Sequence, residues 1–244
     1  MLRSPPERGS WEAAGRSGSW EVRRESGTAA ELQTRDHWVS GGARRVWFFD
    51  CTRPAVVLGS VQPADHVDPA RASGSGVEVV RRRSGGGAVL VVPGETIWVD
   101  VEVPHLDHLW EPDVGRAFNW LGCVWAGALD SLGLGPAMVH SGALLRREWS
   151  ERICFVGLGP GELTVDGRKV LGISQRRSRE GAVFSCAAYL RLHPGALPSL
   201  LALSDAAREL ATAASEASSG ALGAGLAVGV RRADVEAAFL ERLP

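Results

Sequence analysis

The 244-residue sequence contains almost no lysine. Of its 27 basic residues only Lys169 is a lysine, and all the others are arginine. Lysine is normally among the commonest residues, so a single retained lysine is a candidate for a task that arginine cannot perform. A compact ammonium fits where a planar, permanently charged guanidinium does not. Chance survival of one lysine on a turn explains the count about equally well, so composition alone leaves both interpretations open.

Other features are also missing. The formal net charge is −1, which argues against nonspecific electrostatic binding of nucleic acid. No apolar run reaches the ~18 residues of a membrane span, and the first 20 residues contain no apolar signal segment. No CxxC pair is present, which disfavours a structural zinc site and predicts a cytoplasmic protein with free thiols. The four cysteines are Cys51, Cys123, Cys154 and Cys186.

Residues 1–19 are rich in Ser, Gly, Pro and charge, and this composition predicts a disordered leader before a single domain over 20–244. Strands are expected at 20–24, 45–49, 55–58, 77–80, 88–92, 96–103, 162–165, 169–174 and 182–192. Helices are expected at 28–39, 68–72, 113–132 and 234–243. Strands outnumber helices and do not alternate with them one for one. We therefore predict an α+β fold with a mixed or largely antiparallel sheet.

The strongest local signal is the segment RRRSGGGAV at 81–89. Three consecutive glycines between β-prone runs cost conformational entropy. They allow a ligand to approach the backbone closely, and converging N–H groups bind anions. The adjacent Arg81 and Arg82 can add charge-assisted bonds to a phosphate or carboxylate. A flexible hairpin tip with exposed arginines is the alternative. The segment matches neither a Walker A loop nor a dinucleotide fingerprint.

A second signal is DGRKVLGISQRR at 166–177. A turn at Asp166-Gly167 places Lys169 at the start of a strand, and Gly172 allows that strand to pass close to another group. A lysine at this position, facing an anion-binding glycine turn, is a candidate for stabilising an oxyanion or a phosphate.

Together the two blocks resemble the lipoate–protein ligase A family, part of the superfamily of lipoyl ligases, octanoyltransferases and biotin ligases. The blocks have that family's order and separation, and LGSVQP at 58–63 is similar to its segment upstream of the glycine loop. The resemblance spans residues 20–192. A biotin ligase is less consistent with the sequence, because a GRGRxxRxW-type loop is absent.

The resemblance implies a curved mixed, largely antiparallel sheet with flanking helices, related to class II synthetase cores. It implies a lipoate–protein ligase that converts lipoate or octanoate and ATP, with Mg²⁺ on the phosphates, to an acyl-adenylate. A lysine of a lipoyl domain then displaces AMP; the domain belongs to a 2-oxoacid dehydrogenase E2 subunit or is the glycine cleavage carrier protein. By the same resemblance Lys169 bridges the acyl carbonyl and the α-phosphate in the transition states. The acyl-adenylate is held by Arg81, Arg82, Gly86, Gly87, Ala88 and Val89.

The sequence departs from the family's pattern after the glycine loop. Typical ligases carry a His-Asp pair where this chain has Val91 and Val92. The separate C-terminal accessory domain of the longer ligases has no counterpart, and no carboxylate can be assigned to the metal; Glu95 and Asp100 are weak candidates for a metal ligand or a base. A non-catalytic homologue that binds an acyl group or a nucleotide is therefore one alternative.

Cys154, fifteen residues before Lys169, supplies another alternative. It resembles the acyl-accepting cysteine of one class of octanoyltransferases in the same superfamily, which take octanoate from acyl carrier protein without ATP. A cysteine beside a lysine has a larger thiolate fraction and reacts more readily. The competing interpretation is a buried structural thiol, because free cysteine is among the most buried residue types.

Overall fold

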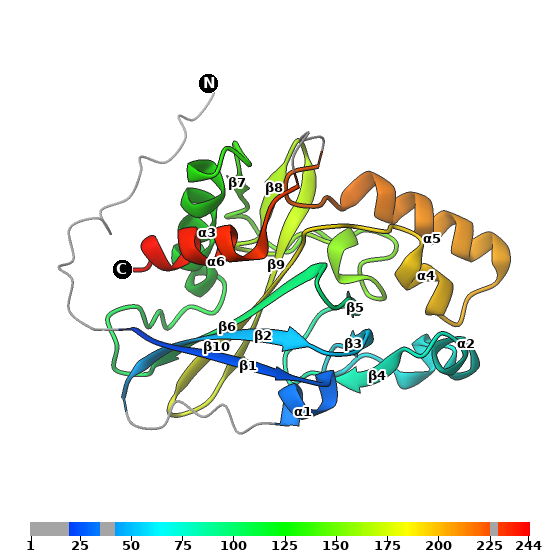
Figure 1. The fold of residues 1–244 in the computed structure, drawn as a ribbon, viewed down its shortest axis with the longest axis horizontal. Coiled ribbons are helices and arrows are strands. Elements are labelled where there is room, and N and C mark those ends of the chain that lie inside the picture. The colour runs from blue at the N-terminus through cyan, green and yellow to red at the C-terminus, as the bar shows by residue number, and fades with distance from the viewer. Residues whose placement is uncertain (1–19, 35–41, 225–228) are drawn as a thin grey trace.

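The structure is a computed structural model that describes residues 20–34, 42–224 and 229–244. It contains a seven-stranded sheet in the order β1-β2-β6-β10-β9-β8-β7 and a three-stranded sheet in the order β4-β3-β5 (Figure 1). The strands of the large sheet are β1 (Trp20–Gly27), β2 (Arg44–Cys51), β6 (Thr96–Pro104), β7 (Met138–Val139), β8 (Leu163–Val165), β9 (Arg168–Arg177) and β10 (Gly181–Tyr189). The small sheet contains β3 (Ala55–Leu58), β4 (Glu78–Arg81) and β5 (Val89–Val91).

The large sheet is antiparallel except at one edge, where β1 runs parallel to β2. All residues of its strand β6 are buried, and Val99, Val101 and Val103 are fully buried on one face. That face packs against α3 (Asn119–Ser131) and α6 (Arg232–Glu241) (Figure 1). Trp125 of α3 stacks on Phe239 of α6 at the centre of this core. The predicted α+β fold with a mixed, largely antiparallel sheet is confirmed.

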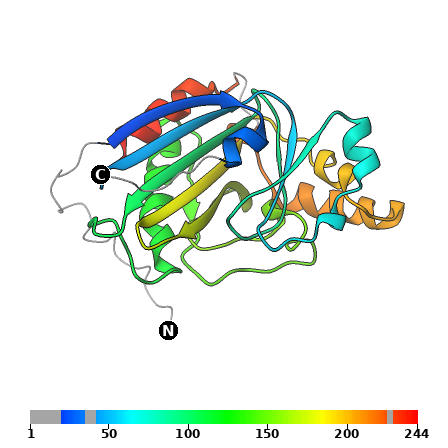
Figure 2. The same ribbon diagram turned by 90° about the horizontal axis from the view of Figure 1, so that it is seen from below.

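The small sheet packs against one end of the other face of the large sheet, and the helices α2 (Pro69–Gly74), α4 (Ala196–Leu200) and α5 (Asp205–Ser218) lie beyond it (Figure 2). On one side of the small sheet, Val57 and Val89 share a cluster with Phe49 and Trp98 of the large sheet and with Phe155 of η4 (Cys154–Val156). The functional site described below lies between these two sheets.

Two of the predicted helices differ from the observed ones. The expected helix over 113–132 begins with a turn instead, because the Asp113 carboxylate accepts hydrogen bonds from the N–H groups of Gly115 and Arg116. A short 3-10 turn, η3 (Arg116–Phe118), then leads into α3. The expected helix over 28–39 is observed as α1 (Ala29–Thr34), and the rest of that prediction lies outside the described residues. The leader predicted over 1–19 also lies outside them.

Within the ranges that the structure describes, no helix is long and apolar enough to cross a membrane. The four cysteines are unpaired; Cys51 and Cys186 are buried, whereas Cys123 and Cys154 are partly exposed.

Candidate functional site

Two backbone hydrogen bonds join the triglycine turn to the segment that carries Cys154. The N–H of Ala88 donates to the Arg152 carbonyl at 2.9 Å, and the N–H of Cys154 donates to the Ala88 carbonyl at 3.0 Å. Gly87 permits this contact, because a Cβ there would lie 2.8 Å from the Ser150 carbonyl oxygen and 2.9 Å from the Cys154 nitrogen. The glycine turn and Cys154 are therefore held as one unit.

Lys169 lies against this unit from β9. Its Nζ donates to the carbonyls of Cys154 at 3.0 Å and Gly157 at 3.2 Å, and lies 2.6 Å from a Glu162 carboxylate oxygen. The side chain is only 3% exposed. Burial alone lowers the pKa of Lys169, but the neighbouring Cys154 and the Glu162 carboxylate outweigh burial and raise the pKa above its ordinary value. The ammonium therefore stays charged throughout the physiological pH range.

Glu162 is a site residue that the sequence analysis missed. Besides Lys169, its carboxylate accepts hydrogen bonds from the N–H groups of Gly159 at 2.6 Å and Ile173 at 3.1 Å. A buried carboxylate with three donors is fully satisfied. It holds Lys169 at one fixed position. The sequence did offer one signal for this role: Glu162 lies just before the Asp166-Gly167 turn, and the lone lysine lies just after it.

Replacing Glu162 by Gln leaves a buried ammonium beside an uncharged amide. We expect the free energy of unfolding to fall by about 3–5 kcal/mol, the usual cost of removing one partner from a buried pair. Urea denaturation measures this change. Asp205→Asn is the matched control, because it breaks an ion pair with Arg208 in which the carboxylate is 91% exposed, and it should change stability far less. Equal losses in the two variants would contradict the buried pair.

Cys154 lies at the junction of two spaces. Its Sγ is 3.8 Å from the Lys169 Nζ, and the residue lines both a wide cleft and a narrow slot. The other cysteines are placed differently: burial raises the pKa of the thiols of Cys51, Cys123 and Cys186. Of the four thiols, Cys154 is the one beside the ammonium.

The cleft has a volume of about 610 Å³, within the usual size of small-molecule sites. All three glycines of the turn line one side of it, and Lys169, Glu162 and Ser174 line another. The side-chain amide nitrogen of Gln175 also lines the cleft and, though buried, has no hydrogen-bond partner. The structure thus brings Lys169 and the triglycine turn to the same ligand-sized space, as the two sequence blocks predict.

The slot is smaller, about 50 Å³, and almost wholly apolar. It opens beside Cys154, Ile173 and Ser174, which it shares with the cleft. It runs between the two sheets, where its walls are formed mainly by Val57, Val89, Val91, Trp98, Phe155 and Ala187. This arrangement places an apolar space behind a polar cleft.

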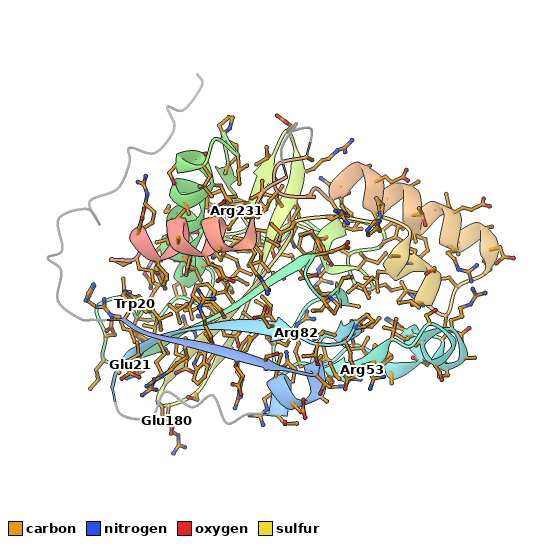
Figure 3. The ribbon with its side chains drawn as sticks, viewed as in Figure 1. Trp20, Glu21, Arg53, Arg82, Glu180 and Arg231 are labelled. Carbon is orange, nitrogen blue, oxygen red and sulfur yellow. The ribbon has the colours of Figure 1, made fainter. Side chains whose placement is uncertain are left out.

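Neither Arg81 nor Arg82 lines the cleft, although Arg82 lines the apolar slot. Arg81 donates to the carbonyls of Gly59, Ser60 and Gln62 and is not among the residues that line the cleft. It ties down the loop that forms one cleft wall. Arg82 is buried at the centre of the molecule (Figure 3), where it donates to the carbonyls of Val57, Gly85 and Gly87. Arg82 therefore bonds directly to the glycine turn, whereas Arg81 bonds to the neighbouring 59–62 loop.

The other residues singled out from the sequence do not line the cleft. Val89 lines the apolar slot, and Ala88 is buried beneath the turn. Glu95 lies apart from the site, paired with Arg191. Asp100 is buried in β6 between the two sheets.

The described residues offer no dedicated magnesium site. Among them no group of three or more His, Cys, Asp or Glu side chains is placed to hold a metal. The one buried carboxylate in the cleft, Glu162, is already committed to three donors. No step is therefore assigned to a protein-bound metal.

The sequence model of the lipoyl protein ligase A/B catalytic domain matches residues 31–243, and the chain belongs to this family. Both the family and the fold predicted from the sequence are confirmed. No curated protein sequence matches the chain.

Solved structures of lipoate ligases have the same fold. One is a bi-partite lipoate protein ligase from Thermoplasma acidophilum, with a TM-score of 0.73 and 15% identity over 93% of this chain and 82% of that chain. Another is a lipoate-protein ligase A bound with ATP (TM-score 0.66, 16% identity, 92% and 83% covered). A third is a putative lipoate protein ligase from T. acidophilum with bound lipoic acid (TM-score 0.66, 17% identity, 92% and 83% covered).

Proposed function

We propose that the chain is an ATP-dependent ligase that transfers lipoate or octanoate, through an acyl-adenylate, to a lysine of a lipoyl domain. The observation that carries this proposal is the Lys169 ammonium, which lines the same cleft as the triglycine turn. The acceptor is a lipoyl domain of a 2-oxoacid dehydrogenase E2 subunit or the glycine cleavage carrier protein. The relatives support these substrates, since one was solved with ATP, one with lipoic acid and one as a system with its E2 lipoyl domain.

The two spaces suit the two parts of an acyl-adenylate. The acyl chain enters at the apolar slot, whose volume of about 50 Å³ must widen to hold it. Its carboxyl end then reaches Cys154, Ile173 and Ser174 at the slot mouth. The phosphate and nucleoside extend into the cleft, between Lys169 and the glycine turn. Adenylation adds charge at the α-phosphate, and a fixed ammonium with nearby backbone N–H groups stabilises that charge more in the transition state than in the ground state.

The contacts of Lys169 constrain how it acts. Its three N–H donors are all used, by Glu162 and by the carbonyls of Cys154 and Gly157. A phosphate oxygen must therefore replace one of these acceptors. The carbonyl bonds, at 3.0 and 3.2 Å, are longer than the 2.6 Å contact with Glu162. We expect a carbonyl to be replaced while Glu162 keeps hold of the ammonium.

A second candidate function rests on Cys154. Its thiol lies at the mouth of the apolar slot and 3.8 Å from the Lys169 Nζ. This position suits a thiolate that takes octanoate from acyl carrier protein as a thioester and passes it to the acceptor lysine. Such an octanoyltransferase needs no ATP.

The chemically conservative change Cys154→Ser separates the two functions. The apo lipoyl domain is incubated with the chain, octanoate and ATP, or with octanoyl-acyl carrier protein, and its intact mass is measured. A ligase acylates the domain only when ATP is present, releases AMP, and keeps its activity after Cys154→Ser. A transferase acts without ATP and loses its activity with the thiol. Binding of an acyl-adenylate analogue with no acylation from either donor would contradict both and indicate a non-catalytic homologue.

A further inference from the structure

A row of polar side chains crosses the face of the large sheet that the small sheet covers. Ser174 of β9, Ser185 of β10 and Asp100 of β6 are direct partners on three adjacent strands, so their side chains point to the same face. Ser84, which precedes the triglycine turn, lies at the cleft end of this row, with its hydroxyl 2.8 Å from that of Ser174. The row therefore runs from the glycine turn to a carboxyl buried between the sheets.

Asp100 is embedded in this row. Its carboxylate accepts hydrogen bonds from the Ser185 hydroxyl and, at 3.1 Å, from the Trp98 indole N–H. The residue is 5% exposed. Burial raises the pKa of Asp100 to about 6, although the bonds from Ser185 and Trp98 act in the opposite direction. Above that pH the carboxylate is a proton acceptor, and below it the carboxyl is neutral.

A small chamber lies against the same row. Its volume is about 30 Å³, enough for a water molecule. Ser84, Ser185 and Asp100 all line this chamber. Because the Ser84 hydroxyl also contacts that of Ser174, a water molecule in the chamber would connect the Ser174–Ser84 pair to Ser185 and Asp100. The charged groups around Asp100 are the chamber arginines Arg82, Arg83 and Arg176, together with Glu102 on the same face of β6 and the neighbouring thiol of Cys186.

Acyl transfer to a lysine requires such a proton acceptor. The acceptor side chain arrives as an ammonium and must lose a proton before its nitrogen can attack. Glu162 is already held by Lys169 and two N–H groups, and the side chain of Glu151 is 75% exposed and paired with Arg146. Ser174, by contrast, lines both the cleft and the slot mouth, where the acyl carbonyl would lie.

We propose that Asp100 accepts this proton through the hydroxyls of Ser185 and Ser174, a role that rests on the proposed acyl transfer. The ammonium N–H bond breaks and its proton passes to Ser174, whose own proton moves to Ser84. Ser84 passes its proton through the chamber water to Ser185, and Ser185 passes its proton to Asp100. The freed nitrogen lone pair forms the C–N bond while the bond from the acyl carbon to the AMP oxygen breaks. AMP departs with that electron pair, and the second nitrogen proton is released to water. A thioester donor would need the same proton removal.

The test uses Asp100→Asn with synthetic octanoyl-AMP as donor, which bypasses adenylation. Two acceptors are compared: the apo lipoyl domain, whose lysine must lose a proton, and hydroxylamine, which is largely unprotonated near neutral pH. General base catalysis contributes about 10²–10⁴-fold, so transfer to the lipoyl domain should fall at least 100-fold. Transfer to hydroxylamine should not change. In the wild type, transfer to the lipoyl domain should decline as the pH falls through about 6. In Asp100→Asn, transfer depends on the free amine of the acceptor lysine, so it should fall about tenfold per pH unit with no break near 6.

Two control variants separate a proton path from a structural role. Ser185→Ala interrupts the row and should reproduce the selective loss. Glu102→Gln changes a buried carboxylate on the same face of β6 that is bonded to Trp47 and should leave the pH profile unchanged. Equal losses with both acceptors in Asp100→Asn would contradict the proposal. So would a break in the pH profile that disappears with His66→Asn instead, because His66 also lines the cleft.

Failure of the proton path and failure of the proposed function give different results. If the wild-type chain acylates the lipoyl domain and Asp100→Asn has the same rate and pH profile as the wild type, only the proton path is overturned. If the wild-type chain acylates nothing from octanoyl-AMP or octanoyl-acyl carrier protein, the proposed function is contradicted, and the proton path with it.

Discussion

Lys169→Met should reduce acylation of the lipoyl domain by at least 10²–10³-fold, the usual loss when one transition-state donor is removed. Methionine preserves most of the side-chain volume but removes the only lysine ammonium in the sequence. Adenylation and transfer to the lipoyl domain should both slow, because the α-phosphate and the acyl carbonyl lose the same cationic partner. Release of pyrophosphate and the mass of the lipoyl domain measure the two steps separately.

Loss of folding must be separated from loss of chemistry in this variant. Lys169→Met also leaves the buried Glu162 carboxylate without its cationic partner, which lowers stability. The double variant Lys169→Met with Glu162→Gln removes that unpaired charge, so it should regain stability without regaining activity. Arg168→Ala, an exposed neighbour on β9, is the matched control and should remain active. Near-normal acylation by the folded double variant would contradict the role of Lys169.

Gly59→Ala should disrupt the cleft from the opposite side. A Cβ at Gly59 would lie inside the contact distance of the Gly86 carbonyl oxygen, 3.0 Å from the Gly86 carbonyl carbon and 3.3 Å from its nitrogen. These atoms are backbone and cannot rotate away, so the triglycine turn must shift. Overpacking of this kind typically costs 1–3 kcal/mol. Because the turn also holds Cys154 through Ala88, acylation should be lost even where the protein still folds.

Gly74→Ala is the matched control for this change. Gly74 lies at the end of α2, and a Cβ there meets nothing within 4 Å. Urea denaturation and acylation assays should find Gly74→Ala close to the wild type, and Gly59→Ala impaired in both. If Gly59→Ala retained full activity, close contact between the 59–62 loop and the glycine turn would not be needed for function.

The features predicted correctly from the sequence are those that short-range patterns determine, namely individual strands and helices and the two motif blocks. The strand expected at 96–103 is observed as β6, and the helix expected from residue 28 begins at Ala29, directly after Thr28. There the Thr28 N–H donates to Glu31 at 2.8 Å and the Glu31 N–H donates back to the Thr28 hydroxyl at 3.3 Å, which forms a capping box. The two motif blocks indicated the family without any contact information. Local propensities and motifs therefore established the fold class and the position of the lone lysine.

Long-range pairings could not be read in the same way. Adjacent residues at the end of a strand point in opposite directions, so the sequence could not tell that Arg82 is buried while Arg81 reaches the 59–62 loop. The Glu162–Lys169 pair depends on how β8 is offset against β9, where the register shifts between Leu163 and Thr164. The row from Ser84 to Asp100 needs the order of three strands, which no local pattern specifies.

The structure of the chain bound to an octanoyl sulfamoyl adenosine analogue, a stable mimic of the acyl-adenylate, tests the site most directly. We expect the sulfamoyl group within hydrogen-bond distance of the Lys169 Nζ and of backbone N–H groups in the triglycine turn, with the octanoyl chain in the slot beside Trp98. An analogue bound elsewhere, or one that leaves all three Lys169 contacts with Glu162, Cys154 and Gly157 unchanged, would contradict the proposed role of this lysine.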